Sequence, residues 1–487
     1  MNAAPVSSPA AQPTAAAVDN GPNPIRQVLP WLVAVALFME SLDTTILNTA
    51  VPKIADAFGV LPLQMKGALS SYTLSLAVFI PISGWMADRF GTRRVFFSAM
   101  GIFTLGSLLC GCSTGIVTLV ASRIIQGAGG AMMVPVGRIC LVRSFPKKHL
   151  LKVISFVAIP GLIGPLLGPL AGGLLVSYVH WRAIFFVNLP IGIAGIVLAI
   201  THMPDYRSAR RLPLDFVGLV LFGSGVALLS YVLEVFGDNA VSPRAMIFLI
   251  ALALLMLAGY GLHAPRQTFP LLRLSLFRQR TFRAAIAGGL LARLGTGGMP
   301  FLLPLLFQVG MGYSPVQSGL LIMPQSIAAI GLRLLATRIL KALGFKRVLL
   351  ANTCLIGALI ALFATMNSST PVWLIVAEGL LFGFSSSLHY TSMNTLVFAD
   401  LSEADTSMGA TIGSTIMQLS LSFGVAVSSL LAEVFIGSDH SAGNPRFVHG
   451  IHAAFLTLGV FTILSSAIFL ELKTKDGAAL SLNNAGD

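Results

Sequence analysis

The sequence predicts an all-α integral membrane protein with fourteen membrane-spanning helices. Three observations lead to this prediction. The 487 residues are 55% hydrophobic and only 10% charged, with a mean hydropathy of +0.85, whereas soluble domains carry about 25% charged residues. Apolar runs near or above the ~20 residues that cross a bilayer recur along the chain. The basic residues concentrate in alternate connections between these runs, as they do in cytoplasmic loops.

The predicted spans follow a tail, residues 1–27, that is rich in Ala, Pro, Ser and Asn and is expected to be flexible. This tail lacks the charged and apolar regions of a secretory signal peptide. A second tail is expected over residues 472–487. The predicted spans are 28–51, 64–86, 95–112, 117–142, 151–179, 182–203, 214–236, 244–263, 282–309, 316–340, 347–366, 371–397, 408–436 and 449–471.

The distribution of Lys and Arg predicts the orientation of these spans. With the N-terminus inside, 22 of the 31 basic residues lie in cytoplasmic segments and four lie within spans. Both termini are therefore expected in the cytoplasm, with the chain crossing a bacterial-type inner membrane many times. The same distribution explains the excess of basic over acidic residues, so nucleic-acid binding is not indicated. The five basic residues expected outside are Lys53, Lys66, Arg182, Arg244 and Arg446.

The sequence offers no constellation for catalysis or metal binding. Its four cysteines lie in apolar runs, where they are expected to pack as small residues without forming disulfides. We find no nucleophile–base pair, no histidine–carboxylate motif and no Walker-type loop. The chain is therefore predicted not to be an enzyme and to need no cofactor. The cysteines are Cys110, Cys112, Cys140 and Cys354.

A charged turn between the second and third spans carries the most specific motif, Gly84-Trp85-Met86-Ala87-Asp88-Arg89-Phe90-Gly91-Thr92-Arg93-Arg94-Val95. A tight loop with cytoplasmic arginines would have this composition without any further role. The stretch also resembles the G-x-L-a-D-r-x-G-r-k loop of the major facilitator superfamily, from which Met86 and Thr92 depart. The resemblance implies conformational gating by the matching residues, which are Gly84, Asp88, Arg89, Gly91 and Arg93.

A partial repeat of this motif indicates two related halves. Gly344-Phe345-Lys346-Arg347-Val348 repeats the motif's end, without a counterpart of Asp88. Because the copies follow spans 2 and 10, six-helix halves begin at spans 1 and 9, as internal repeats do in transporters. The expected domains are a bundle at 28–203, a two-helix insert with basic linkers at 204–281, and a bundle at 282–471. This arrangement resembles the fourteen-helix drug:proton antiporter branch of the superfamily.

The first span contains two carboxylates, Glu40 and Asp43, three residues apart on one helical face. An ionisable side chain in hydrocarbon costs ~2.5–3.5 kcal/mol and usually marks a pathway or relay. Two like charges this close do not both ionise readily, so one of them is expected to exchange a proton near neutral pH. A permanent ion pair with an arginine, as structural support, is the alternative. Leu42–Ala50 resembles the family's first-span signature, which implies proton coupling at Asp43. Glu40 is not part of that signature, so the prediction of a role for it rests on its position alone.

The fourth and fifth spans carry two further motifs. Arg123–Gly130 resembles the family's R-x-x-q-G-x-g motif, which implies that Arg123 tunes proton transfer. Because arginine keeps its proton, its expected task is to favour the ionised form of a nearby Asp43. In the fifth span, glycines at every third or fourth position allow close helix packing, and the prolines bend the helix. This span also resembles the exporters' antiporter motif, which implies a conformational role for Gly164, Pro165, Gly168 and Pro169.

The predicted function is proton-coupled export of small lipophilic or drug-like molecules by a monomer in the bilayer, through alternating access. Gly129–Arg138 and Ser392–Leu396 resemble multidrug transporters of the same branch. A uniporter or proton symporter for a dedicated metabolite is the alternative, ahead of a membrane-embedded enzyme or a sensor. Candidate substrate-cavity residues are Asn48, Gln126, Arg293, His389 and Tyr390. The remaining charges within spans are expected to face the cavity, to pair across the bundles or to snorkel to an interface. They are Arg138, Arg293, Arg333, Glu378 and Glu433.

Overall fold

The computed structural model describes residues 24–208, 213–235, 241–403, 405–436, 445–474 and 476–477. The predicted tails lie largely outside these ranges. The described residues contain helices and no strands, and fourteen of the helices are long and apolar enough to cross a membrane, as predicted. The first span is longer than expected and continues to Phe58, where the positive φ of Gly59 (66°) ends the helix.

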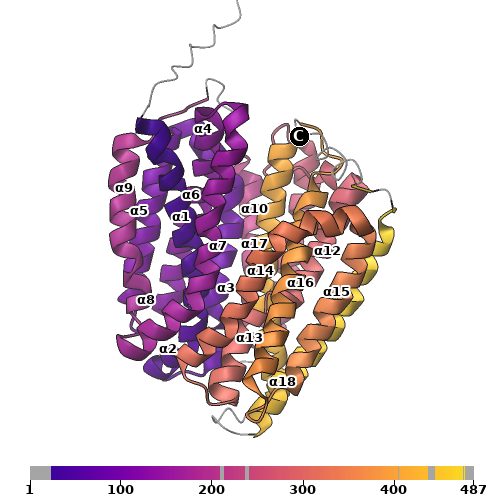
Figure 1. The fold of residues 1–487 in the computed structure, drawn as a ribbon. Helices are drawn as coiled ribbons and strands as arrows, with labels where there is room; N and C mark the ends of the chain where they lie inside the picture. The colour runs from indigo at the N-terminus through magenta and orange to yellow at the C-terminus, as the bar shows by residue number, and fades with distance from the viewer. Residues whose placement is uncertain are drawn as a thin grey trace, which may run out of the picture.

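The first bundle in Figure 1 consists of the helices before residue 204. Its spans are interrupted by short 3₁₀ segments, of which η1 (Asn48–Ala50) joins the first two helices. Its described helices are α1 (Pro24–Ile46), α2 (Val51–Phe58), α3 (Lys66–Phe79), α4 (Ser83–Phe90), α5 (Thr92–Gly111), α6 (Ile116–Ser144), α7 (Lys147–Tyr178), α8 (Ala183–Phe186) and α9 (Asn188–His202).

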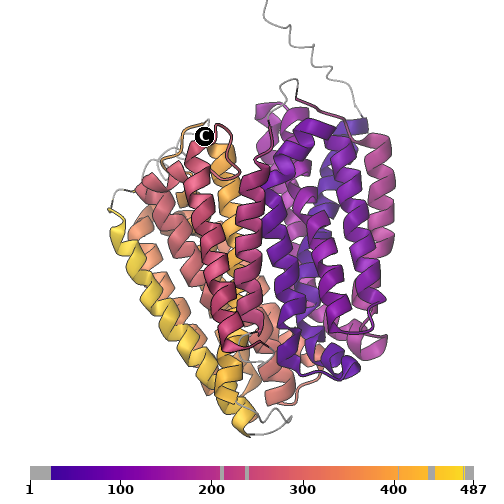
Figure 2. The ribbon, with the colours of Figure 1, turned by 180° about the vertical axis from the view of Figure 1, so that it is seen from behind.

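The second bundle lies beside the first, and a helical hairpin covers one side of the seam between them (Figure 2). The hairpin consists of α10 (Phe216–Val235) and α11 (Pro243–His263), and α10 packs against α3 of the first bundle and α17 of the second. The described helices of the second bundle are α12 (Arg280–Thr296), α13 (Met299–Leu305), α14 (Pro315–Leu343), α15 (Phe345–Leu362), α16 (Val372–Val397), α17 (Thr406–Ile436) and α18 (Pro445–Ser465).

Hydrogen bonds to Asp215 connect the chain segments at the two ends of this hairpin. Its carboxylate accepts hydrogen bonds from His263 Nε2 (2.7 Å) and from the backbone N–H groups of Leu271 (3.0 Å) and Gly218 (2.8 Å). Burial alone would raise the pKa of Asp215, but the hydrogen bonds from these three donors outweigh burial and hold the pKa below its ordinary value. The carboxylate therefore stays ionised and keeps the linker after α11 against the start of α10.

The two copies of the glycine motif make the same turn. Gly91 ends α4 and begins α5 with φ 95° and ψ 145°, and Gly344 separates α14 from α15 with φ 75° and ψ 157°. A side chain is strained at such positive φ values, so glycine is needed at both sites. The sequence repeat therefore corresponds to a repeated backbone geometry in the two bundles.

The two ends of the interface between the bundles are built differently. We call the end with the Gly91 and Gly344 turns, where both described chain ends lie (Figure 1), the terminal end, and the opposite end the far end. At the far end one continuous apolar core includes Leu63 of the first bundle and Phe307 and Ile436 of the second. Towards the terminal end the cores divide, because Phe96 packs within the first bundle and Leu349 packs mainly with the second bundle and the hairpin.

Candidate functional site

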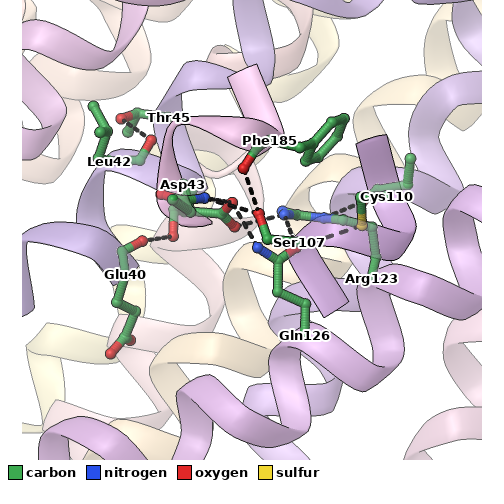
Figure 3. A network of polar contacts seen from close by, with 12 residues as sticks. Glu40, Leu42, Asp43, Thr45, Ser107, Cys110, Arg123, Gln126 and Phe185 are labelled. Carbon is green, nitrogen blue, oxygen red and sulfur yellow. Dashed lines mark hydrogen bonds and ion pairs between the residues drawn. The ribbon is translucent and has the colours of Figure 1, made fainter. Parts of the chain in front are cut away.

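Asp43 is the centre of a closed polar network inside the first bundle (Figure 3). Its Oδ2 atom accepts a hydrogen bond of 2.5 Å from Arg123 Nη1, and its Oδ1 atom accepts bonds from Gln126 Nε2 (2.8 Å) and Asn188 Nδ2 (3.0 Å). The Asp43 side chain is 0% exposed and that of Arg123 is 2% exposed. All three neighbours donate to the carboxylate, and hydrogen bonds from a guanidinium to a carboxylate are among the strong ones in proteins.

Arg123 is oriented by more than its ion pair. Its Nη1 also donates to Gln126 Oε1 (2.8 Å), and its Nε donates to the backbone carbonyl of Ala68 (3.2 Å). The guanidinium lies over the Tyr72 ring, 4.2 Å from the ring centroid, in cation–π geometry. Helices α3 and α6 therefore fix the position from which the guanidinium meets Asp43.

The sequence analysis assigned no role to Asn188. Asn188 begins α9, is fully buried, and joins Asp43 to Ser107 through its amide (Nδ2 to Ser107 Oγ, 3.1 Å). Ser107 in turn donates to the carbonyl of Phe185 (2.8 Å). The signal that could have indicated Asn188 is a polar side chain at the start of a strongly apolar span.

Glu40 does not share the surroundings of Asp43. Figure 3 shows its carboxyl turned away from the network, and Glu40 lines a cavity of about 450 Å³ between the two bundles. Residues three apart on a helix differ by about 60° in direction. In α1 this difference places Asp43 against α6 and Glu40 towards the cavity. The charge of Asp43 is therefore balanced by Arg123, and the expected close pair of like charges is not the dominant interaction.

The cavity is lined from both bundles, but few of the predicted cavity residues line it. Tyr390 does, with 39% of its surface exposed. Arg293 lies behind it, with its guanidinium 5.8 Å from the Tyr390 ring centroid. Gln126 belongs to the Asp43 network, and His389 is buried beside Thr353 (Nδ1 to Oγ1, 3.2 Å).

Asn48 is buried in η1 and also does not line this cavity. Substrate binding by each of the five residues stays a prediction. Arg138 of α6 does line the cavity, as does Gln418 of α17, to which the sequence gave no role. The side chain of Arg333 lies outside the described residues. Glu378 is buried in α16 with only 3% of its surface exposed.

The glycines of α7 bring this helix into direct contact with α1. A Cβ atom at Gly168 would lie 2.1 Å from Thr45 Oγ1, and one at Gly164 would lie 2.7 Å from Ser41 Cβ. Both distances are far below van der Waals contact. Side chains at these two positions would therefore push α7 away from the helix that carries Glu40 and Asp43.

The prolines of α7 create a contact between the bundles. Pro169 has no N–H, so the carbonyl of Pro165, four residues earlier, has no partner within the helix. Ser326 of α14 donates its hydroxyl to this carbonyl (2.9 Å). The carbonyl of Pro169 accepts a hydrogen bond from Thr49 Oγ1 (3.1 Å). The motif therefore links α7 both to η1, which follows α1, and to the opposite bundle.

The loop motif contacts α6 and the segment that follows α9. Asp88 Oδ1 lies 2.9 Å from Arg143 Nη2 of α6, and Arg93 Nε donates to the carbonyl of Met203. A Cβ atom at Gly91 would lie 2.1 Å from Asp205 Oδ1, whereas one at Gly84 would have no neighbour within 4 Å. Arg89 lines a small cavity that the motif shares with the hairpin linkers and the start of α17. A gating role for these residues stays a prediction.

The comparisons with known proteins agree on one family. The family model described as Major Facilitator Superfamily matches residues 33–425. The chain is 40% identical to a protein of Serratia proteamaculans (strain 568) over 426 residues, which cover 88% of each chain. It is 41% identical to a protein of Escherichia coli O157:H7 over 444 residues, 91% of this chain and 92% of that one. Both relatives carry the name "Putative multidrug resistance protein MdtD".

Solved structures of low sequence similarity share the fold. A peptide transporter POT in complex with sulfate superposes with a TM-score of 0.69 at 13% identity, over 92% of this chain and 95% of that chain. A D-xylose-proton symporter superposes with a TM-score of 0.67 at 13% identity, over 93% and 99%. These likenesses concern the arrangement of the helices alone.

Proposed function

The chain belongs to the major facilitator superfamily, and we propose that it is a proton-coupled exporter of small molecules that works by alternating access. The family match makes the chain a multi-pass membrane transporter and not an enzyme. The observation that carries the proposal is the buried Asp43–Arg123 pair at membrane depth, one helical turn from a cavity between the two bundles. The names of the relatives support drug-like substrates.

We further propose that both termini are cytoplasmic and that the membrane is a bacterial inner membrane. The excess of Lys and Arg in the loops of the terminal end supports this orientation. The far end, with its continuous core, then faces outward and is closed. We propose that the structure corresponds to an inward-open state, in which the cavity is reached from the cytoplasm.

Asp43 is proposed to carry the proton. In the inward-open state it is ionised and holds Arg123, Gln126 and Asn188, so α1 is tied to α6 and α9. A proton that reaches Asp43 from outside would neutralise the carboxylate and leave the guanidinium without its partner. The hydrogen bonds that join these helices would then weaken, and the equilibrium between the two states of the transporter would shift.

Export rather than import is supported by the α7 glycines and prolines, whose pattern resembles that of exporters, and by the relatives' names. The energy source is proposed to be the proton gradient, without a bound cofactor. A monomer is sufficient for this mechanism, because the chain supplies both bundles. Import or uncoupled movement of one metabolite is the competing function, and the following experiment separates the two.

The test is efflux from proteoliposomes loaded with a panel of lipophilic cations and small metabolites, with and without an imposed pH gradient. We expect gradient-driven efflux by the wild-type protein and its loss in Asp43→Asn, because an amide cannot take up the proton. Asp56→Asn is the matched control, since Asp56 is exposed on the helix that continues the same span. Normal gradient-driven efflux by Asp43→Asn would refute the assignment, and movement independent of the gradient in all three proteins would indicate a facilitator.

A further inference from the structure

We propose that the cavity between the bundles binds an amphoteric solute, with its ammonium group against the Glu40 carboxylate and its carboxylate against the Arg138 guanidinium. The solute would combine these two charges with a short aliphatic body. The inference rests on the proposed transport function and names the class of molecule that this function moves.

The first argument is that the charged residues lining the cavity lack ion-pair partners among the described residues. Among the described residues that line the cavity, Glu40 of α1 and Arg138 of α6 are the charged ones. Neither has an ion-pair partner among the described residues. The Oε2 atom of Glu40 is buried and accepts no hydrogen bond from the described part of the chain. A buried charged group without a partner is costly. A ligand that carries both charges would supply an ion-pair partner to Glu40 and another to Arg138.

The neighbouring charges make the contrast clear. Asp43 is paired with Arg123 at 2.5 Å inside the first bundle, and Lys66 is paired with Glu433 at 2.9 Å between the bundles. The first pair joins α1 to α6, and the second joins α3 to α17. Glu40 and Arg138, the two charged residues that line the cavity, have no such ion pair among the described residues.

The second argument is the rest of the cavity wall. Hydroxyl and amide groups alternate with aliphatic side chains, and Tyr390 is the one aromatic residue among the described lining residues. A simple lipophilic cation is usually held by several aromatic rings. Here it would meet one ring, which has the Arg293 guanidinium behind it, and it would be repelled by Arg138. A simple anion would in turn be repelled by Glu40.

The third argument is size. A volume of about 450 Å³ lies within the usual range for small-molecule sites. Such a space accommodates a dipeptide-sized molecule. The aliphatic residues that would contact its body come from both bundles and include Leu37, Val134, Leu162, Met417 and Leu421.

The test uses three probes with the same body. Leucyl-leucine carries both charges, its methyl ester carries the ammonium alone, and its N-acetyl derivative carries the carboxylate alone. Binding to the purified full-length protein is measured by calorimetry at pH 7. We expect the dipeptide to bind roughly tenfold or more tightly than either derivative, since each charged contact contributes at least that much in a cavity.

Two substitutions test which charged group of the solute each of the two residues binds. Glu40→Gln is expected to remove the preference for the dipeptide over its N-acetyl derivative, and Arg138→Gln the preference over its methyl ester. Asp56→Asn, at an exposed position of α2 outside the cavity, is the control and is expected to keep the wild-type order. Equal binding of the three probes, no binding of the dipeptide, or preferences that survive both substitutions would each overturn the proposal.

The outcome is independent of the proton-coupling test. Gradient-driven efflux of other solutes together with equal binding of the three probes would refute the amphoteric substrate and leave the exporter intact. Preferential dipeptide binding with no effect of a pH gradient would refute coupling and leave the substrate class intact.

Discussion

The far end and the terminal end of the bundle interface differ in where their charges lie. At the far end Lys66 of α3 pairs with Glu433 of α17 across the interface, and the two side chains are only 2% and 15% exposed. At the terminal end the Asp88–Arg143 pair stays within the first bundle, with its side chains 40% and 37% exposed. The far end is thus joined by a buried pair between the bundles, whereas the Asp88–Arg143 pair of the terminal end is exposed and lies within one bundle.

This difference indicates which interactions between the bundles must break during the transport cycle. Exchange between the two states requires the far end to open, so the Lys66–Glu433 pair must be separated and its charges solvated. Hydrogen bonds between the bundles, from Ser429 Oγ to the carbonyl of Leu63 (3.3 Å) and from Gln308 Nε2 to that of Thr49 (3.0 Å), must also break. The described contacts of the terminal-end motif, by contrast, leave its acidic residue free of the second bundle.

The largest effect is expected from Lys66→Met. This substitution removes the ammonium group that lies 2.9 Å from the Glu433 carboxylate, and breaking a buried pair by removing one partner typically costs about 3–5 kcal/mol. The far end should therefore open more readily. The measurement is the labelling rate of a cysteine placed at the buried Ser429 by an impermeant maleimide, in a protein whose four native cysteines are replaced.

Two controls accompany this prediction. Lys53→Met removes an exposed lysine near the same end and should leave the labelling rate at position 429 unchanged. Lys66→Met combined with Glu433→Gln removes both members of the pair and should return the rate towards that of the parent protein. An unchanged rate in Lys66→Met alone would mean that the apolar core closes the far end without help from the pair.

A smaller effect is expected from Gly319→Ala in α14. A Cβ atom at Gly319 would lie 2.4 Å from the backbone carbonyl oxygen of Pro169 in α7, which cannot move aside as a side chain would. Overpacking of this kind costs about 1–3 kcal/mol. Gly319→Ala should therefore lower the thermal unfolding midpoint and raise labelling at position 429.

Gly331→Ala is the matched control, because it lies in the same helix and a Cβ atom there would have no neighbour within 4 Å. Alanine favours a helix over glycine by up to about 1 kcal/mol, so this variant should be as stable as the parent or slightly more stable. Equal behaviour of the two alanine variants would show that α7 and α14 do not pack as closely as described.

The sequence predicted the spans well because each span is a local property, a run of apolar residues of sufficient length. It also predicted the Gly91 turn and suggested Arg123 as a partner of Asp43, and the structure brings those two side chains together. It counted Lys66 among the basic residues of the outer side, at the start of the second span, and did not predict that this residue is buried where α3 begins. Nothing in the local sequence indicates a partner 367 residues away, because the packing of the two bundles decides which charge meets it.

The surroundings of Glu40 and Asp43 illustrate a second limit. In a helix that is apolar on most sides, the sequence does not reveal which face meets a neighbouring helix and which meets a cavity. Spacing placed the two carboxylates on one face, and a rotation of about 60° between them was enough to separate their environments. The freed carbonyl of Pro165 could be predicted from Pro169, but its partner Ser326 could not.

The smallest effect on stability is expected at the terminal end, from Asp88→Asn. Because the Asp88–Arg143 pair is exposed, its contribution to the free energy of unfolding should be about 0–1 kcal/mol. The thermal unfolding midpoint and the labelling rate at position 429 should stay near the parent values. If the motif acts when the terminal end closes, as the family resemblance implies, the efflux rate should nevertheless fall while substrate binding persists. A marked loss of stability would instead show that Asp88 already supports the inward-open state, and the contrast between the two ends would then be wrong.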